Sequence, residues 1–215
     1  MKNVKLLLAT CALFLVFGAC GNSQNQKEQN EGTTETPMVI TPDMAYCDVK
    51  GPVKRVDDIY FDRSGCIVSV YDVNPFAIEE PYRDFDTVTF DYTDCCKWVR
   101  DNQGQISLIT CFEGREEFTW NDGHVAEILS YFEAQKTLTV YEYDPEGRLV
   151  KQAMYNGMED EEVTQDEEWL FSTTEYTYLE FDKYGNWIRR KATYRDATVD
   201  FVDETEQTRV IEYFE

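Results

Sequence analysis

A four-residue turn motif, Asp-x-x-Gly, recurs from residue 62 onward and constrains the fold more than any other feature of the chain. The paired residues are Asp62 and Gly65, Asp101 and Gly104, Asp144 and Gly147, and Asp182 and Gly185. An aspartate that opens a type I turn accepts a hydrogen bond from the backbone two residues on. The fourth position needs a positive φ, which glycine adopts without steric cost. Such turns join antiparallel strands, so each motif predicts a β-hairpin. A fifth segment, "WNDGH", is expected to form a tight Asp-Gly turn, in which Gly123 takes the same role.

The residues that flank the turns support the same prediction. The residue before each aspartate should face the residue two places after each glycine, across the hairpin. The expected pairs are Phe61 with Ile67, Tyr143 with Leu149, and Phe181 with Trp187. Aromatic residues opposite aliphatic or aromatic ones stabilise a sheet by about 0.2–1 kcal/mol per pair. Arg100 with Ile106 departs from this pattern, which predicts a weaker hairpin.

The spacing of the motifs predicts one repeated architecture. The turn glycines recur at about twenty residues, with two gaps about twice as long. Between them, segments such as "KTLTVYEY" and "TTEYTYLEF" are rich in the β-branched and aromatic residues that strands prefer. We therefore expect an all-β fold, an antiparallel meander of repeated β-hairpins that forms a curved or rolled sheet. The acidic segment 158–169 is expected to be a solvated insert, with a short helix before Trp169.

The segments "YDPEGRLV" and "FDKYGNWIRR", with the opening "GPVKRVDDIYFDRSG" and the closing "TRVIEYFE", carry a family resemblance. They are similar to the YD repeats of the Rhs family and to the related short hairpin repeats of exported lipoproteins from Gram-negative anaerobes. The resemblance covers roughly residues 51–215. It implies a meandering antiparallel sheet and no particular activity, because a fold alone does not define a function.

The N-terminus reads as an export signal. Lys2 and Lys5 precede an apolar run over residues 6–17, and small residues lead to Cys20. This resembles the lipobox of bacterial lipoproteins, in which the cysteine becomes the lipidated N-terminus; Phe17 departs from the usual aliphatic residue. Ordinary cleavage or an uncleaved anchor are the alternatives. The expected organisation is a lipoprotein signal peptide over 1–19, a lipidated Cys20 and disordered polar tether over 20–42, and a single β-hairpin-repeat domain over 43–215. The lipid predicts anchoring in the cell envelope, at the outer membrane, with the face left open.

The charge balance excludes one class of partner. The formal net charge is −22, and loss of Lys2 and Lys5 with the signal takes it to about −24. Such a field repels phosphate backbones, so we expect no nucleic-acid binding. A cationic partner is compatible with this charge. Solubility outside the cell is the simpler explanation of it.

The cysteines leave the disulfide pattern open. Besides Cys11 and Cys20, the chain has Cys47, Cys66, Cys95, Cys96 and Cys111, an odd number without a regular framework. Export permits disulfides, but buried free thiols are the favoured interpretation at this stage.

No motif in the sequence indicates a particular reaction. His124, the only histidine, lies beside a turn and is expected to be exposed. One histidine without a Cys-x-x-C motif provides no ligand set for zinc, so neither a metal nor another cofactor is predicted. The acidic clusters at 159–162 and 166–168 favour a surface loop over a catalytic pair. Trp98, Trp120 and Trp169 form a possible aromatic binding surface, against the simpler interpretation that they belong to the core.

We therefore expect an exported, lipid-anchored protein of the cell envelope that acts as a non-catalytic binding or scaffold module. Its expected partners are the membrane, through the lipid, and an envelope protein or a glycan. A glycan-binding protein or a hydrolase that uses surface carboxylates is the alternative. A purely structural role, through an open sheet edge, is a third possibility.

Overall fold

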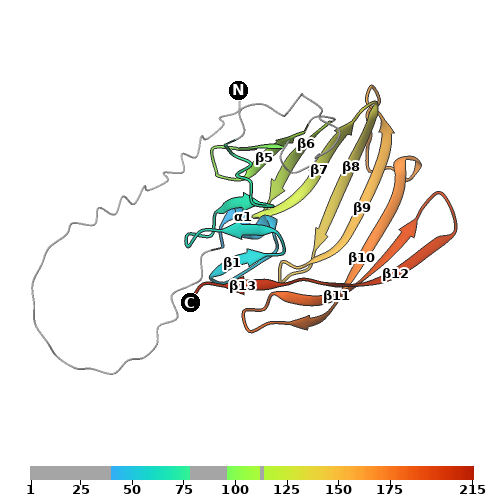
Figure 1. The fold of residues 1–215 in the computed structure, drawn as a ribbon. Coiled ribbons are helices and arrows are strands. Elements are labelled where there is room, and N and C mark those ends of the chain that lie inside the picture. The colour runs from blue at the N-terminus through green and yellow to red at the C-terminus, as the bar shows by residue number, and fades with distance from the viewer. Residues whose placement is uncertain (1–39, 78–95, 112–113) are drawn as a thin grey trace, which may run out of the picture. The chain divides into compact units, whose positions relative to one another are not determined.

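Two antiparallel sheets and a short helix make up the part of the chain that the computed structural model describes, residues 40–77, 96–111 and 114–215 (Figure 1). The helix is α1 (Pro42–Tyr46). The smaller sheet contains β1 (Val53–Val56), β2 (Ile59–Phe61), β3 (Ile67–Val70) and β13 (Ile211–Tyr213). The larger sheet contains β4 (Lys97–Arg100), β5 (Ile106–Thr110), β6 (Gly114–Asn121), β7 (His124–Phe132), β8 (Gln135–Tyr143), β9 (Leu149–Met158), β10 (Leu170–Phe181), β11 (Trp187–Asp196) and β12 (Phe201–Thr208).

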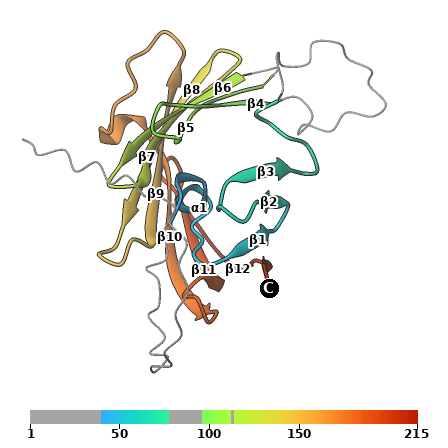
Figure 2. The same ribbon diagram turned by 90° about the vertical axis from the view of Figure 1, so that its left-hand side faces the viewer.

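The nine-stranded sheet is the predicted antiparallel meander. Its strands follow one another in chain order from β4 to β12, each paired with the next. Figures 1 and 2 show these strands side by side in a curved sheet, and among the described strands β4 and β12 have a neighbour on one side only. The prediction of an all-β fold built from hairpins is confirmed.

The first repeat does not join this meander, contrary to the expectation of a single sheet. The hairpin β2–β3 belongs to the four-stranded sheet, whose order is β13, β1, β2, β3. The C-terminal strand β13 pairs with β1, with Tyr213 opposite Val53 and Ile211 opposite Val56. The chain therefore leaves the large sheet after β12 and closes the small sheet with its last strand. Turn chemistry is local and could not predict this long-range pairing.

The four Asp-x-x-Gly segments all form the same turn. The glycine φ angles lie between 77° and 83°, and each glycine N–H donates to the aspartate carbonyl oxygen at 2.9–3.2 Å. In the turn that begins at Asp144, the carboxylate also accepts the backbone N–H groups of Glu146 and Arg148, at 3.0 and 2.9 Å. The guanidinium of Arg148 pairs with Asp144 and Glu146, so this arginine holds its own turn.

The predicted cross-strand pairs are confirmed. Phe61 faces Ile67, Tyr143 faces Leu149, Phe181 faces Trp187, and Arg100 faces Ile106. The prediction that the Arg100 hairpin is weaker overlooked a long-range contact. Arg100 donates to both carboxylate oxygens of Asp43 in α1, and its guanidinium lies 3.9 Å from the ring centre of Phe76.

Residues 40–51 run past the turns of both sheets and connect them. Thr41 caps α1 by accepting the N–H of Met44 at 3.2 Å, and its hydroxyl donates to the carbonyl of Gly65. Further along, the backbone N–H and C=O of Lys50 bond to the side-chain amide of Asn186, at 2.6 and 2.7 Å. The Asp-x-x-Gly turns thus also supply docking points for the N-terminal segment.

The main hydrophobic core lies between α1, the small sheet and the first strands of the large sheet. Its buried members are Met44, Val49, Val53, Val56, Phe61, Ile67, Ile106 and Ile109. Figure 2 shows α1 between the two sheets. We call the sheet face that carries Trp98, Ile109 and Trp120 the inner face, because these side chains pack against that core.

Arg209, which lies between β12 and β13, joins β11 of the large sheet to residues 40–51. It is 8% exposed, and its guanidinium donates to the carbonyls of Trp187, Cys47 and Asp48, at 2.7, 3.0 and 2.7 Å. The same group lies 4.0 Å from the ring centre of Trp187. Five donors in a planar fork suit this bridging role.

The acidic insert is less solvated than expected. Its short helix is the 3₁₀ turn η2 (Glu167–Trp169), which fits the expectation, but Val163 is only 9% exposed. A Cβ added to Gly157 would lie 2.5 Å from Val163 and 3.1 Å from Trp169. Glycine in β9 therefore lets the insert pack closely against the outer face of the sheet.

The preference for free thiols was wrong for two cysteines. Cys96 and Cys111 form a disulfide that closes the β4–β5 hairpin. Cys47 is free and half-buried, and Cys66 is free and exposed. Cys95, the signal peptide, Cys20 and the predicted tether up to residue 39 lie outside the described residues.

Candidate functional site

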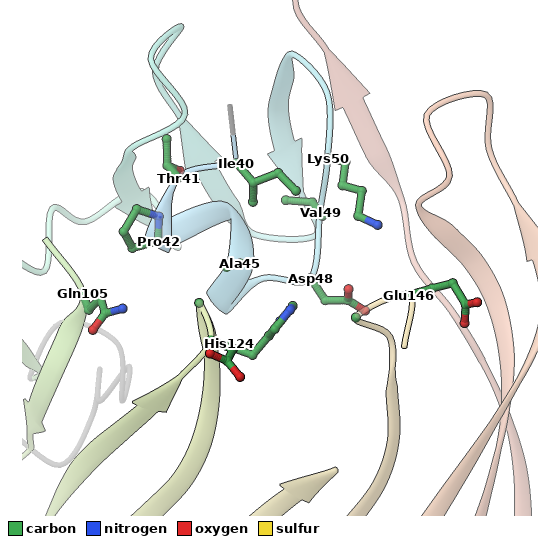
Figure 3. A pocket seen from close by; sticks show the side chains of 13 residues that line it. Ile40, Thr41, Pro42, Ala45, Asp48, Val49, Lys50, Gln105, His124 and Glu146 are labelled. Atoms are coloured by element: carbon green, nitrogen blue, oxygen red, sulfur yellow. The ribbon is translucent and has the colours of Figure 1, made fainter. Parts of the chain in front are cut away.

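Three adjoining cavities lie at the hairpin ends of the large sheet, and residues 40–51, which include α1, line the first and the third of them. The first has a volume of about 280 Å³, the second about 450 Å³ and the third about 350 Å³. Figure 3 shows the first, with Asp48, His124 and Glu146 grouped between the helix and the ends of the hairpins. Concave sites that combine apolar walls with a few converging polar groups are where proteins usually bind ligands.

The cavities adjoin because they share lining residues. His124 and the turn residues that flank it separate the first cavity from the second, and two tyrosines of β8 separate the second from the third. The shared residues are Asp122, His124 and Gly147 for the first pair, Tyr141 and Tyr143 for the second pair, and Ala45 and Asp48 for the first and third cavities.

His124 stands at the centre of this arrangement and is half-buried, not exposed as the sequence suggested. Its imidazole stacks on the ring of Tyr143, with ring centres 4.6 Å apart and planes 30° apart. Tyr143 is held in turn by its hydroxyl, which donates to the carbonyl of Val125 at 2.9 Å. The imidazole also lies close to Gly147, where an added Cβ would be 3.0 Å from Nε2.

Acidic side chains outnumber basic ones in the lining. The acids are Asp48, Asp57, Asp122, Asp144 and Glu146, and the bases are Lys50 and Arg209. The chain as a whole has 42 acidic and 20 basic residues, so the field of the whole protein has the same sign. These cavities favour a cationic or a neutral, hydroxyl-bearing ligand over an anion.

Asp48 is the most enclosed of these acids. Burial raises the pKa of its carboxyl above the ordinary value, and the nearby charge of Arg209 opposes that rise. The indole N–H of Trp187 donates to the carboxylate at 3.0 Å and also favours the ionised form. Asp48 therefore has partners already and helps to connect residues 40–51 to β11.

The pKa of Asp144 is determined by hydrogen bonds within its own turn. Burial acts to raise the pKa of its carboxyl, but hydrogen bonds from the Arg148 backbone and guanidinium outweigh burial and hold the pKa below its ordinary value. The opposite pKa directions of Asp48 and Asp144 thus each have a structural cause. They do not by themselves identify a catalytic acid and base.

The described residues bring no catalytic group into contact with His124. Apart from its stack on Tyr143, no hydroxyl, thiol or carboxylate of the described chain hydrogen-bonds to the imidazole. In the same part of the chain, no group of three or more His, Cys, Asp or Glu side chains is placed to hold a metal ion.

The sequence-predicted residues fall into two groups in the structure. Gly123 and Gly147 line the cleft, and Gly104 and Gly185 do not line any of the three cavities. The three tryptophans of the possible aromatic surface do not share a face. Trp98 and Trp120 pack on the core at the inner face, where the Trp120 indole N–H donates to the carbonyl of Ile106 at 2.8 Å. Trp169 lies beside Gly157 on the opposite face.

Sequence reasoning missed Asp48, Asp122 and Tyr143 as lining residues. Asp48 lies in a segment without a motif, and its contacts are with residues far along the chain. The position of His124 next to a turn was the one feature of the sequence that could have indicated this site. In a meander, the turns of alternate strand pairs lie along the same edge of the sheet, so residues in those turns are expected to be close together.

Comparison with protein-family models and with curated protein sequences finds no match for this chain. The resemblance to YD repeats therefore stays a prediction. No helix among the described residues has the length and apolar character needed to cross a bilayer.

Proposed function

We propose that this protein is an exported, lipid-anchored module of the cell envelope that binds a partner without catalysing a reaction. Cys20 would carry the lipid, the segment from there to about residue 39 would act as the tether, and the domain that follows would present the cleft. The outer membrane is the proposed location. A cationic or neutral group of an envelope protein is the proposed ligand.

The observation that carries the proposal is the row of three adjoining cavities at the turn ends. Asp122 makes no hydrogen bond within the described chain, and it lines both the first and the second cavity. Glu146 is 65% exposed at its side chain and faces the first cavity from the next hairpin. Asp122 thus has no hydrogen-bond partner within the described chain, whereas Glu146 also pairs with Arg148, and the two carboxylates reach the first cavity from different turns.

The cleft is tested by the double variant Asp122→Asn and Glu146→Gln. Asparagine tolerates the φ of 48° found at position 122, so the turns should keep their shape. We expect the variant to lose at least about tenfold in recovery of a partner from the native envelope, which corresponds to about 1.4 kcal/mol. The measurement is quantitative mass spectrometry after capture of the tagged, lipidated full chain.

The matched control is Asp203→Asn with Glu206→Gln in β12. It removes the same charge from a strand where both side chains are exposed. Recovery should stay at the wild-type level in this control. Equal recovery by the cleft variant and the control variant would contradict a role for the cleft.

The anchor is tested separately by Cys20→Ala. Without the thiol there is no site for the thioether-linked lipid, so the protein should move from the membrane fraction to the soluble fraction of the envelope. Fractionation followed by immunoblotting measures this. A variant that stays in the membrane fraction would show that something other than Cys20 lipidation holds the protein there.

A glycan is the second candidate ligand, because Tyr141 and Tyr143 line the second cavity together with Asp122 and Asp144. Aromatic faces and hydroxyl-accepting carboxylates are the groups that a sugar needs. A glycan array with the full chain, and an assay for released reducing ends, separate a sugar-binding role and a hydrolase from the protein-binding role. Binding that depends on Asp122 would favour the glycan, and turnover would favour the hydrolase.

A further inference from the structure

The third cavity is lined by residues of both sheets. The small sheet contributes Val56 of β1 and Ile59 of β2, and the large sheet contributes Val125 and Ile128 of β7. Its volume of about 350 Å³ falls within the range of small-molecule pockets, about 300–1,000 Å³. Apolar side chains that line such a space are in contact with water until a ligand covers them.

The charged residues in this lining have partners within the chain. Asp48 accepts the indole N–H of Trp187 at 3.0 Å, and Arg209 donates to three backbone carbonyls. Asp57 is exposed to solvent and accepts the backbone N–H of Val210 at 3.2 Å. Asp48 and Arg209 also carry opposite charges. Among the described residues of this lining, no enclosed charge is therefore left for a ligand to neutralise, which favours an uncharged ligand over an ion.

Two tyrosine hydroxyls of this lining have no partner. Neither Tyr46 nor Tyr141 makes a hydrogen bond through its hydroxyl to a group of the described chain. Tyr46 is held by its ring instead, which packs edge-on against Trp98 and Phe118, with ring centres 5.7 and 6.0 Å apart. Burial is the main cause that raises the pKa of both tyrosines above the ordinary value, so both hydroxyls stay protonated and can donate. A half-buried donor without a partner is costly, so a ligand that accepts its hydrogen bond is favoured.

The first and second cavities are lined by different polar side chains. Asp122 and His124 line both of those cavities, and Glu146 lines the first, but none of the three lines the third. The third cavity thus combines apolar walls and aromatic rings with two uncharged donors. Small-molecule pockets usually have this arrangement, in which the apolar walls provide most of the contact and a few polar groups fix the orientation of the ligand.

We propose that the third cavity binds an uncharged small molecule with an apolar, ring-containing body and a hydrogen-bond acceptor, and that the acceptor takes the free hydroxyls of Tyr46 and Tyr141. The apolar body covers Val56, Ile59 and Ile128 and removes them from water. Aryl ketones and aryl amides are the simplest members of this ligand class. The inference goes beyond the proposed partner binding, which uses Asp122 and Glu146 in the neighbouring cavities.

Ligand-observed NMR titration of the full chain tests the ligand class with probes that share a naphthalene body. 2-Acetylnaphthalene is uncharged and has an acceptor, naphthalene lacks the acceptor, and 2-naphthoate and 2-naphthylmethylammonium are ions of similar shape. We expect saturable binding of 2-acetylnaphthalene and roughly two- to tenfold weaker binding of naphthalene, because one hydrogen bond is missing. Both ions should bind at least about tenfold more weakly than 2-acetylnaphthalene, because the cavity does not compensate their charge. Equal binding of all the probes, or preferred binding of an ion, would overturn the inference.

The double variant Tyr46→Phe with Tyr141→Phe tests the position of the site. It removes both hydroxyls and no hydrogen bond within the described chain, so it should unfold at a temperature no lower than wild type. We expect it to bind 2-acetylnaphthalene as weakly as naphthalene. The control is Tyr155→Phe, which makes the same chemical change on the outer face, opposite Leu138, at a residue that lines none of the three cavities. The control should keep the preference for 2-acetylnaphthalene.

Two further results would overturn the inference: no saturable binding of 2-acetylnaphthalene to wild type, or an unchanged preference for it in the double tyrosine variant. In either case, partner capture that still depends on Asp122 and Glu146 would leave the proposed function standing. Binding of 2-acetylnaphthalene through Tyr46 and Tyr141, with capture that does not depend on the two carboxylates, would support this inference and contradict the proposed function.

Discussion

Replacing Arg209 by alanine should lower the free energy of unfolding by about 3–5 kcal/mol, the range expected when one partner of a buried charged network is removed. The substitution leaves the carbonyls of Trp187, Cys47 and Asp48 without their donors, and it leaves Asp48 without the nearest cation. Each buried acceptor left unpaired adds its own desolvation cost. Urea unfolding of the full chain at neutral pH, followed by tryptophan fluorescence, measures the change.

Two further arginine variants serve as controls. Arg209→Lys keeps the charge but cannot reach three carbonyls with a planar fork, so it should fall between alanine and wild type. Arg189→Ala removes an arginine that is 44% exposed at its side chain and pairs with Glu180 and Glu206 at the surface. It should cost less than about 1 kcal/mol. An Arg209→Ala variant as stable as Arg189→Ala would mean that residues 40–51 are held against β11 by other contacts.

Replacing Gly147 by valine should lower the free energy of unfolding by about 2–4 kcal/mol. The glycine has a φ of 77°, a region that a β-branched residue adopts only under strain. Its added Cβ would also lie 3.0 Å from Nε2 of His124, so the imidazole must shift from its stack on Tyr143. Thermal unfolding together with urea unfolding measures the loss.

Gly185→Val is the matched control for this prediction. Its φ of 81° is nearly the same, but nothing lies within 4 Å of the position of its Cβ. The control should therefore show the backbone strain alone, and the difference between the two variants reports the contact with His124. A Gly147→Val protein that kept full stability and lost only a ligand would contradict the assignment of this segment as a structural turn.

The local part of the fold could be predicted from the sequence. Each turn depends on residues that are adjacent in the chain, so an aspartate and a glycine three places apart determine it, and the pairing of Tyr143 with Leu149 follows. The second sheet could not be predicted in this way. It depends on the pairing of β13 with β1, in which Val53 faces Tyr213 from the other end of the described chain. Residues 40–51 likewise dock through residues far along the chain, because Cys47 contacts Arg209 and Lys50 contacts Asn186, 162 and 136 residues away.

The candidate site could not be predicted from the sequence either, because it too depends on contacts between residues far apart in the chain. His124 looked like an exposed residue after a turn, because nothing near it in the chain predicts the stack on Tyr143 or the passage of α1 above it. Glu116 looked like one acid among 42 until the register placed it on the inner face, away from Glu117 and Arg115. A count of charges cannot separate a solvated acid from one on the inner face of the sheet.

Site-specific photo-crosslinking tests the central claim, that the cleft around α1 is where a partner binds. A photoreactive amino acid is placed at position 122, which lines the first and second cavities, and separately at position 203 in the exposed strand β12. The full, lipidated chain is irradiated in its native envelope, and adducts are identified by mass spectrometry. We predict a defined adduct from position 122 that is absent from position 203. The same adducts from both positions, or adducts from position 203 alone, would contradict the claim.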